Sequence, residues 1–187
     1  MNKKRGFTIF FAMLVGSLAL AVGFAIYDLT VREIDLSAAA SQSQYAIYAA
    51  DTGVECALYW DSKAPALNGV SSIFATSTGT GNAATSGSGT DCNDQNIVSR
   101  GTPTVPYATS TSGWSAWAIT ANSSAATTTF TLAIPNNGTP VQTYCAVVEV
   151  GKATISGVLY TTIISRGYNT CLSAGVTRLE RTLQVSY

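Results

Sequence analysis

Residues 1–27 read MNKKRGFTIFFAMLVGSLALAVGFAIY, a basic start followed by a long uncharged run. Lys3, Lys4 and Arg5 come just before the 21 residues Phe7–Tyr27, which contain no charged side chain. At about 1.5 Å per residue, such a run forms a helix of roughly 30 Å, which is enough to cross the hydrocarbon core of a membrane. The basic cluster is expected to stay in the cytoplasm, so the rest of the chain lies outside.

The polar residues that follow the apolar run distinguish an anchor from a removable signal. An ordinary secretory signal peptide has a shorter apolar region that ends in a small-x-small cleavage site. Here the run ends at Asp28, and Arg32, Glu33 and Asp35 come next. The sequence therefore predicts a retained anchor. A buried core helix is the alternative, but it leaves no place for three basic side chains at its start.

The helical pattern continues beyond the apolar run. No proline occurs between Asp28 and Trp60, which predicts one helix from about Phe7 to Trp60, roughly 80 Å long. Residues 7–27 would lie in lipid and residues 28–60 outside it. The outer half carries an apolar stripe that is expected to pack on the following residues: Ile47, Ala50, Val54 and Leu58, with Ile34, Ala38, Tyr45 and Tyr48 on or near a neighbouring face. A coiled coil is less well supported, because no heptad repeat with charged flanks is sustained.

Residues 61–187 have the composition of a β-rich head. The low-complexity segment Thr76–Thr90 (TSTGTGNAATSGSGT) is expected to be a surface loop. Five strands are predicted from their composition: Trp114–Thr120, Thr127–Ile134, Tyr144–Val150, Val158–Ser165 and Arg178–Ser186. Gly-containing turns between the last three favour an antiparallel meander. The fold class is therefore α+β, a long N-terminal helix whose first half is transmembrane and whose second half packs on a C-terminal antiparallel sheet.

Composition excludes several classes of function. The 187 residues carry ten basic and ten acidic side chains and no histidine. Clustered Lys and Arg, which a nucleic-acid-binding surface needs, do not occur outside residues 1–6. No cofactor is expected, and without His or a Cys-x-x-Cys pair a zinc site is not indicated. The cysteines lie outside the apolar run and are expected to form disulfides in an oxidising compartment: Cys56, Cys92, Cys145 and Cys171.

Two clusters of oxygen-bearing side chains are candidates for chemistry. Asp51 and Glu55 lie four residues apart on the helix and form an acid–base pair in principle, although a solvated helix face explains them more simply. A second cluster is a weak calcium candidate: Asp91, Asn93, Asp94 and Asn96. It lacks the Gly and the terminal Glu of a full EF-hand loop, so a polar turn is the preferred interpretation. With no His, an enzyme is not expected.

Aromatic residues and glycosylation motifs mark possible surfaces. Tyr107, Trp114 and Trp117 can form a sugar-stacking patch, although aromatic residues at alternate strand positions more often belong to a core. Asn122 and Asn137 begin Asn-x-Ser/Thr motifs, which indicate surface positions.

The block Arg5-Gly6-Phe7-Thr8-Ile9 resembles the processing site of type IV pilins and type II secretion pseudopilins. In that family a prepilin peptidase cuts after the glycine and methylates the new N-terminus. The resemblance implies that residues 1–6 are a cleaved leader, that the cut follows Gly6, and that Phe7 becomes N-methylphenylalanine. Ala49–Leu58 (AADTGVECAL) resembles the end of the long helix in minor pilins, and the segments 167–171 and 178–187 look like the last strands of the head.

The resemblance also implies partners and a location. Before assembly the chain would be a single-pass protein of the inner membrane with its head outside, and afterwards part of an extracellular or periplasmic filament. Its partners would be the prepilin peptidase and other pilin subunits, which pack through the N-terminal helix. A major pilin of the filament, or a membrane-anchored adhesin-like binding module, are the alternatives.

One position departs from the family pattern. The family usually has a glutamate as the fifth residue after the cut, and Phe11 stands there. In the family that carboxylate meets the N-terminal ammonium of the preceding subunit, which offsets the cost of a charge in hydrocarbon. The first subunit of a filament has no predecessor. Phe11 therefore favours a tip or initiating minor subunit over the major pilin.

Four cysteines allow three pairings, and the expected sheet favours one. A hairpin turning at about Ala153–Ile155 would put Cys145 near the far end of the sheet, where a turn at Gly167–Ala174 would bring Cys171. Cys145–Cys171 and Cys56–Cys92 are the predicted disulfides.

Overall fold

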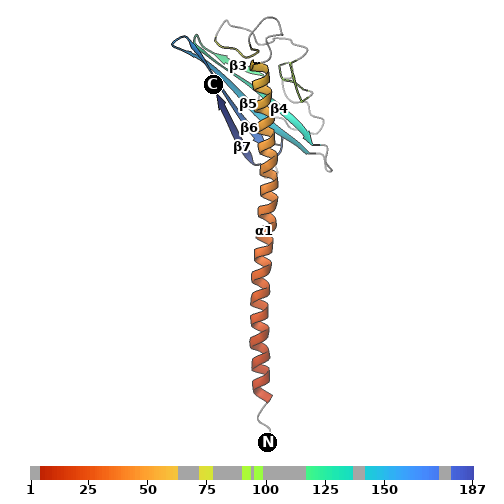
Figure 1. Cartoon of the computed structure of the whole chain (residues 1–187). Helices are drawn as coiled ribbons and strands as arrows, with labels where there is room; N and C mark the ends of the chain where they lie inside the picture. The colour runs from red at the N-terminus through yellow and green to blue at the C-terminus, as the bar shows by residue number, and fades with distance from the viewer. Residues whose placement is uncertain are drawn as a thin grey trace. The chain divides into compact units, whose positions relative to one another are not determined.

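The computed structural model describes residues 5–62, 72–77, 90–93, 95–98, 117–136, 142–172 and 178–187. The chain divides into an N-terminal unit, Met1–Ser41, and a head, Gln42–Tyr187. The elements are labelled in Figure 1 and run in the order α1 (Arg5–Ser62), β1 (Asp91–Cys92), β2 (Gln95–Asn96), β3 (Ala118–Ala121), β4 (Ala125–Asn136), β5 (Gln142–Ile155), β6 (Val158–Tyr168) and β7 (Glu180–Ser186).

The head contains a five-stranded antiparallel sheet in the order β3-β4-β5-β6-β7. Consecutive strands are neighbours throughout, which makes the sheet a meander. One face of this sheet is covered by the part of α1 that belongs to the head (Figure 1). The expected α+β class is confirmed, and α1 extends two residues beyond Phe7 and Trp60 at its two ends. A separate two-stranded ribbon is formed by β1 and β2.

The β5–β6 hairpin turns later than expected. Ile155 pairs with Val158, so the turn consists of Ser156 and Gly157, whose φ angles are 53° and 81°. Two consecutive positive φ angles match the tight hairpin turns that fit the right-handed twist of strands. The prediction of a turn at Ala153–Ile155 is wrong because those residues continue the β5–β6 ladder.

The end of β6 also differs from the expectation. Gly167 was expected to begin a turn, but it lies inside β6, which continues to Tyr168. The expected loop Thr76–Thr90 is described at its ends only, where Thr90 is fully buried, and residues 78–89 lie outside the described residues.

The face of α1 that packs on the sheet is made mostly of small residues. The buried positions of this face recur at helical spacing and are Ala46, Ala49, Ala50, Gly53, Val54 and Ala57. Ala50 and Val54 were expected there. Ile47 and Tyr48 are exposed instead, because the sheet approaches the helix too closely to admit side chains of their size.

Two glycines, one on each side, show how close this approach is. A Cβ atom added to Gly167 would lie 2.0 Å from the carbonyl oxygen of Ala46 and 2.3 Å from the backbone nitrogen of Ala50. A Cβ added to Gly53 would lie 2.3 Å from the Ser165 hydroxyl and 2.8 Å from a methyl group of Val148. The backbone of α1 therefore lies directly on β6, with no side chain in between at Gly167.

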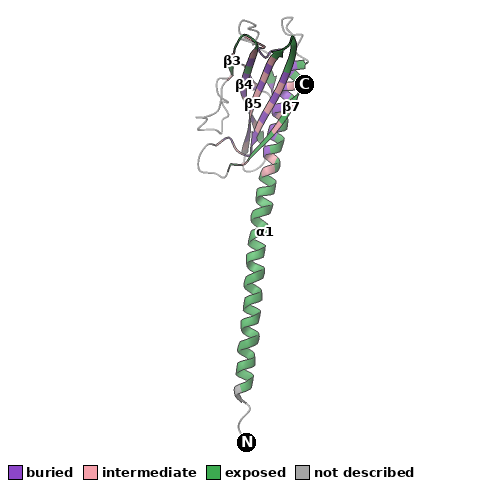
Figure 2. Ribbon diagram, turned by 90° about the vertical axis from the view of Figure 1, so that its left-hand side faces the viewer, coloured by how far each residue is buried: buried purple, intermediate pink, exposed green. Residues whose placement is uncertain are grey.

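Beyond this contact the core is built from large side chains. Phe74 stacks on Trp117 and Phe130, with ring centroids 5.9 and 6.0 Å away. Trp60, at the end of α1, and Leu132 of β4 are buried in the same cluster. Figure 2 shows that the buried residues belong to the head, whereas residues 7–41 of the N-terminal unit are exposed.

The close contact at Gly167 predicts a large and local cost of substitution. Gly167→Ala should lower the free energy of unfolding by about 3 kcal/mol, because the added methyl group overlaps backbone atoms that cannot move aside. Denaturant unfolding of the full chain in detergent, followed by tryptophan fluorescence, measures it. Gly151→Ala is the matched control, since its Cβ would lie 3.7 Å from the nearest atom, the Thr162 carbonyl oxygen. Equal stability of the two variants would contradict the close contact.

Candidate functional site

The N-terminal unit exposes its apolar side chains. Phe7 is 76% exposed and Phe24 71% exposed, and the other large apolar residues between them are also exposed. The helix is long and apolar enough to cross a membrane. A helix that is apolar all round needs apolar surroundings. This part of the chain therefore has the properties of a membrane anchor or signal.

Two hydroxyl groups of this helix are satisfied within it. The Ser17 hydroxyl donates to the carbonyl oxygen of Leu14 at 2.9 Å, and the Thr30 hydroxyl donates to that of Ile26 at 2.8 Å. Such internal hydrogen bonds remove the cost of placing a hydroxyl group in hydrocarbon. Asp28 and Arg32, the first charged residues after the apolar run, form an exposed ion pair at 3.0 Å.

The segment that resembles a processing site lies at the beginning of α1. Arg5 and Gly6 are helical in their backbone, whereas Lys3 and Lys4 lie outside the described residues. Phe7 and Phe11 are exposed, Phe11 by 59%.

Polar contacts fix the helix where it enters the head. Asn169 donates from its side chain to the Gln42 side-chain oxygen at 2.9 Å, and its own oxygen accepts from the backbone of Leu179. The guanidinium of Arg181 donates to the Ser43 hydroxyl at 2.8 Å. The first turn of the head helix is thereby bonded to the end of β6 and to β7.

A buried ionic cluster fixes the other end of the helix. Asp61 forms an ion pair with Lys152 of β5, and both side chains are only 4% exposed. The hydroxyl groups of Ser72 and Tyr187 also donate to the Asp61 carboxylate, the latter at 2.6 Å. An acid in the last turn of a helix is unfavourable next to the negative end of the helix dipole. Lys152 supplies the positive charge that offsets it.

The same cluster changes the titration of Tyr187. Burial raises the pKa of its phenol, and the hydrogen bond to Asp61 and the negative charge of that residue raise it further. Tyr187 therefore stays neutral, and keeps donating its proton to Asp61, well into the alkaline range.

Two disulfides join distant parts of the head. Cys56 of α1 is bonded to Cys92 of β1, and Cys145 of β5 is bonded to Cys171. These are the two pairs expected from the sequence. Closing loops of 36 and 26 residues stabilises a fold by roughly 3–4 kcal/mol each in the chain-entropy model. Two disulfides suggest an extracytoplasmic domain.

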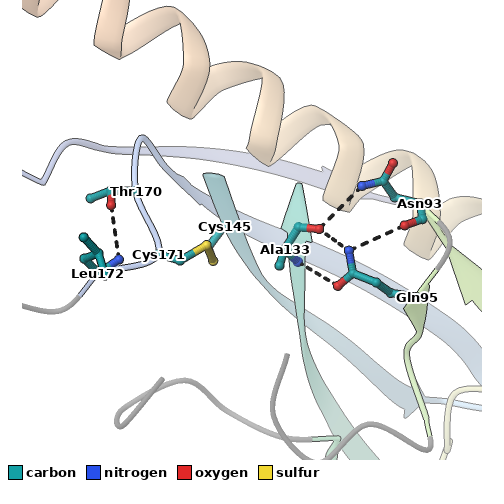
Figure 3. Close-up of a disulfide and its surroundings, with 7 residues drawn as sticks. All are labelled: Asn93, Gln95, Ala133, Cys145, Thr170, Cys171 and Leu172. Carbon is teal, nitrogen blue, oxygen red and sulfur yellow. Dashed lines mark hydrogen bonds between the residues drawn. A yellow bond between two sulfur atoms is a disulfide. The ribbon is translucent and has the colours of Figure 1, made fainter. Parts of the chain in front are cut away.

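The weak calcium candidate lies on the β1–β2 ribbon. Asp91 is exposed, the Asn96 side-chain oxygen accepts from the backbone of Val98 at 3.1 Å, and Asp94 lies outside the described residues. Asn93 has a positive φ of 49° and directs its side-chain nitrogen towards the Ala133 carbonyl (Figure 3). Among the described residues of this cluster, Asp91 and Asn96 pair across the ribbon, and Asn93 follows β1 as a turn residue.

Gln95, which sequence analysis did not single out, holds this ribbon to the sheet. Its side-chain nitrogen donates to the Ala133 carbonyl, and its oxygen accepts from the Ala133 backbone nitrogen at 3.1 Å, as Figure 3 shows. β3 pairs with β4 only between Ala126 and Thr129. The Gln95 side chain therefore hydrogen-bonds to the backbone of β4 at Ala133, beyond the part of β4 that β3 covers.

The remaining candidate residues from the sequence differ in whether they are exposed or buried. Asp51 and Glu55 are exposed on the helix. Trp117 stacks in the core against Phe74, while Tyr107 and Trp114 lie outside the described residues. Among the motifs for glycosylation, Asn122 is exposed and Asn137 lies outside the described residues.

The sequence held weak signals for the residues that were missed. Asp61 is an acid at the end of a long helix, and Lys152 is the only charge between Glu149 and Arg166 in an otherwise apolar and hydroxyl-rich stretch. Each signal is ambiguous alone, because only the fold brings the two together.

No protein-family model, no curated protein and no solved structure matches this chain. Its topology is pilin-like: a long apolar N-terminal helix contacts, through its C-terminal part, a five-stranded antiparallel sheet that carries disulfides.

The Asp61–Lys152 pair predicts a characteristic mutant cycle. Lys152→Met should lower the free energy of unfolding by about 3–5 kcal/mol, because it leaves a buried carboxylate without a counter-charge. Adding Asp61→Asn should recover most of this loss, since it removes the buried charge; the amide oxygen still accepts from one of the two hydroxyl groups, and the amide nitrogen can donate to the other. Arg32→Met is the control: its pair with Asp28 is exposed and is worth less than about 1 kcal/mol. Additive losses in the double variant would show that the pair is not coupled.

Proposed function

We propose that this chain is a structural, non-catalytic subunit of a type IV pilus or of a type II secretion pseudopilus. It begins as a single-pass protein of the inner membrane with its head outside, is cut after Gly6 by a prepilin peptidase, and then joins an extracellular or periplasmic filament through its N-terminal helix. The observation that carries the proposal is the continuous helix α1, which exposes apolar side chains in one part and packs against a disulfide-bonded sheet in another.

The exposed apolar helix supports an assembly role beyond simple anchoring. Large apolar residues project from it: Phe7 is 76% exposed, Met13 72% and Phe24 71%. A lipid bilayer can cover them before assembly, and the same helices of neighbouring subunits can cover them afterwards. Ser17 and Thr30 need no partner from either environment, because their hydroxyl groups bond to their own helix.

Within this role we propose a minor subunit that initiates the filament or forms its tip. Phe11 is the supporting residue: it stands where the resemblance places a glutamate, and its exposed ring carries no negative charge that could form an ion pair with the ammonium group of a preceding subunit. A charge at this depth would need such a partner. A subunit at the tip has no predecessor and loses nothing by carrying phenylalanine.

The proposed function predicts how the N-terminus is processed. The mature chain should begin at Phe7, with its α-amino group methylated, and Gly6→Leu should block the cut because a bulky side chain would occupy the place of the glycine hydrogen. Edman sequencing or intact mass of the membrane fraction measures both. Gly16→Ala is a suitable control, since a Cβ at Gly16 would have no atom within 4 Å. A chain that keeps Met1 in cells with active peptidase would refute the proposal.

The proposed tip position predicts the effects of gene deletion and of substitutions at Phe11. Deletion of the gene should reduce the number of filaments more than their length, because initiation is lost and elongation is not. Phe11→Glu should not improve assembly, since the new acid has no preceding ammonium to meet; Phe11→Leu, an apolar change, should behave as the unaltered chain.

Immunogold labelling of the head separates the alternatives. Gold at one end of each filament agrees with a tip subunit. Labelling along the whole length would identify a major pilin, and unaltered filaments after deletion, with loss of surface attachment only, would favour an adhesin-like module.

A further inference from the structure

The turn between β3 and β4 carries the sequence Asn122-Ser123-Ser124, and all three residues are exposed. Asn-x-Ser is the acceptor pattern for N-linked glycosylation. The pattern alone occurs often by chance, so the geometry of the turn is the deciding evidence.

The turn holds the Asn122 carboxamide by its oxygen. That oxygen accepts hydrogen bonds from the backbone nitrogens of Ser124 at 2.9 Å and Ala125 at 2.8 Å, and the Ser124 hydroxyl donates to it at 3.4 Å. The backbone is fixed as well: Asn122 donates to the Ala125 carbonyl at 2.8 Å, and Thr154 donates to the Ser124 carbonyl at 2.9 Å. All the hydrogen bonds found for this carboxamide within the described residues go to its oxygen, and the residue is exposed, so Nδ2 is accessible from solvent.

We propose that Asn122 is an N-glycosylation site, with a lipid diphosphate-linked oligosaccharide as the donor and a membrane-bound oligosaccharyltransferase as the enzyme. Donors on the carboxamide oxygen draw electron density from nitrogen and make an Nδ2 proton easier to remove. Nδ2 then attacks the anomeric carbon of the donor: a C–N bond forms, the C–O bond to phosphate breaks, and the lipid diphosphate leaves. The Nδ2 proton passes to a base of the transferase.

An exposed apolar patch next to the turn gives the glycan a surface to cover. The tip of the β5–β6 hairpin exposes Ile155 by 59%, Val158 by 53% and Tyr160 by 49%. Ala125 pairs with Ala153, which pairs with Tyr160, so Tyr160 lies two strand spacings, roughly 10 Å, from the turn. One or two sugar units reach that far. Contiguous exposed apolar patches of this kind usually mark a surface that something covers.

The inference rests on export of the head, which the proposed function requires. The test is intact-mass and glycopeptide analysis of the full chain, purified from the membrane or filament fraction of its own host. We expect an added glycan mass on the peptide that contains Asn122, on molecules whose four cysteines are oxidised. Asn122→Gln and Ser124→Ala should remove it completely, whereas Ser124→Thr and the matched control Ser123→Ala should retain it.

The outcomes distinguish this inference from the proposed function. A chain that begins at Phe7, is oxidised and carries no glycan on Asn122 would overturn the glycosylation site while leaving the filament role intact. A glycan attached only to Asn137 or to a hydroxyl group would overturn it as well. A reduced chain that still begins at Met1 would overturn both. Oxidised cysteines in the Asn122→Gln variant show that a lost glycan is not the result of misfolding.

Discussion

At Gly167 the backbone of β6 touches the backbone of α1, and much of the head depends on this contact. Because no side chain fits between the Gly167 α-carbon and the carbonyl of Ala46, the part of the helix face next to Gly167 must consist of small residues. Small residues bury little apolar area each, so the contact alone contributes little hydrophobic stabilisation. The head compensates at the two ends of the helix segment, with polar bonds at Gln42 and the buried ionic cluster at Asp61.

The same helix follows two different side-chain patterns. In the head its buried face is made of small residues, which allow close approach to a sheet. In the N-terminal unit large apolar residues project on all sides, and nothing in the described chain covers them. A helix with the second pattern is stable only in lipid or against other apolar helices, whereas the first pattern suits a folded head. The change between patterns falls near Gln42, after the charged residues that follow the apolar run.

The features predicted best from the sequence are those that local patterns encode. The uncharged run Phe7–Tyr27 and the absence of proline up to Trp60 were sufficient for α1, and β-branched runs were sufficient for β4 to β7. The packing face of α1 was partly wrong because the helical pattern was assigned from large apolar residues such as Ile47, whereas close backbone contact selects alanine. The turn at Ser156 was missed because strand length depends on pairing. Gln95 and the Asp61–Lys152 pair depend on contacts between distant segments, which no local pattern reveals.

In the proposed filament role, where the chain is held by its helix, the arrangement of bonds in the head has a mechanical consequence. A pull on α1 along its axis would act in shear against the sheet, across a contact made mostly by small residues. Sliding would have to break the Asp61–Lys152 pair and the Asn169–Gln42 bond together, because both connect the helix to the sheet. The Cys56–Cys92 disulfide adds a covalent connection from the helix to the β1–β2 ribbon, and Gln95 continues it to the edge of β4. These bonds are thus placed where a load on the helix would be transferred to the sheet.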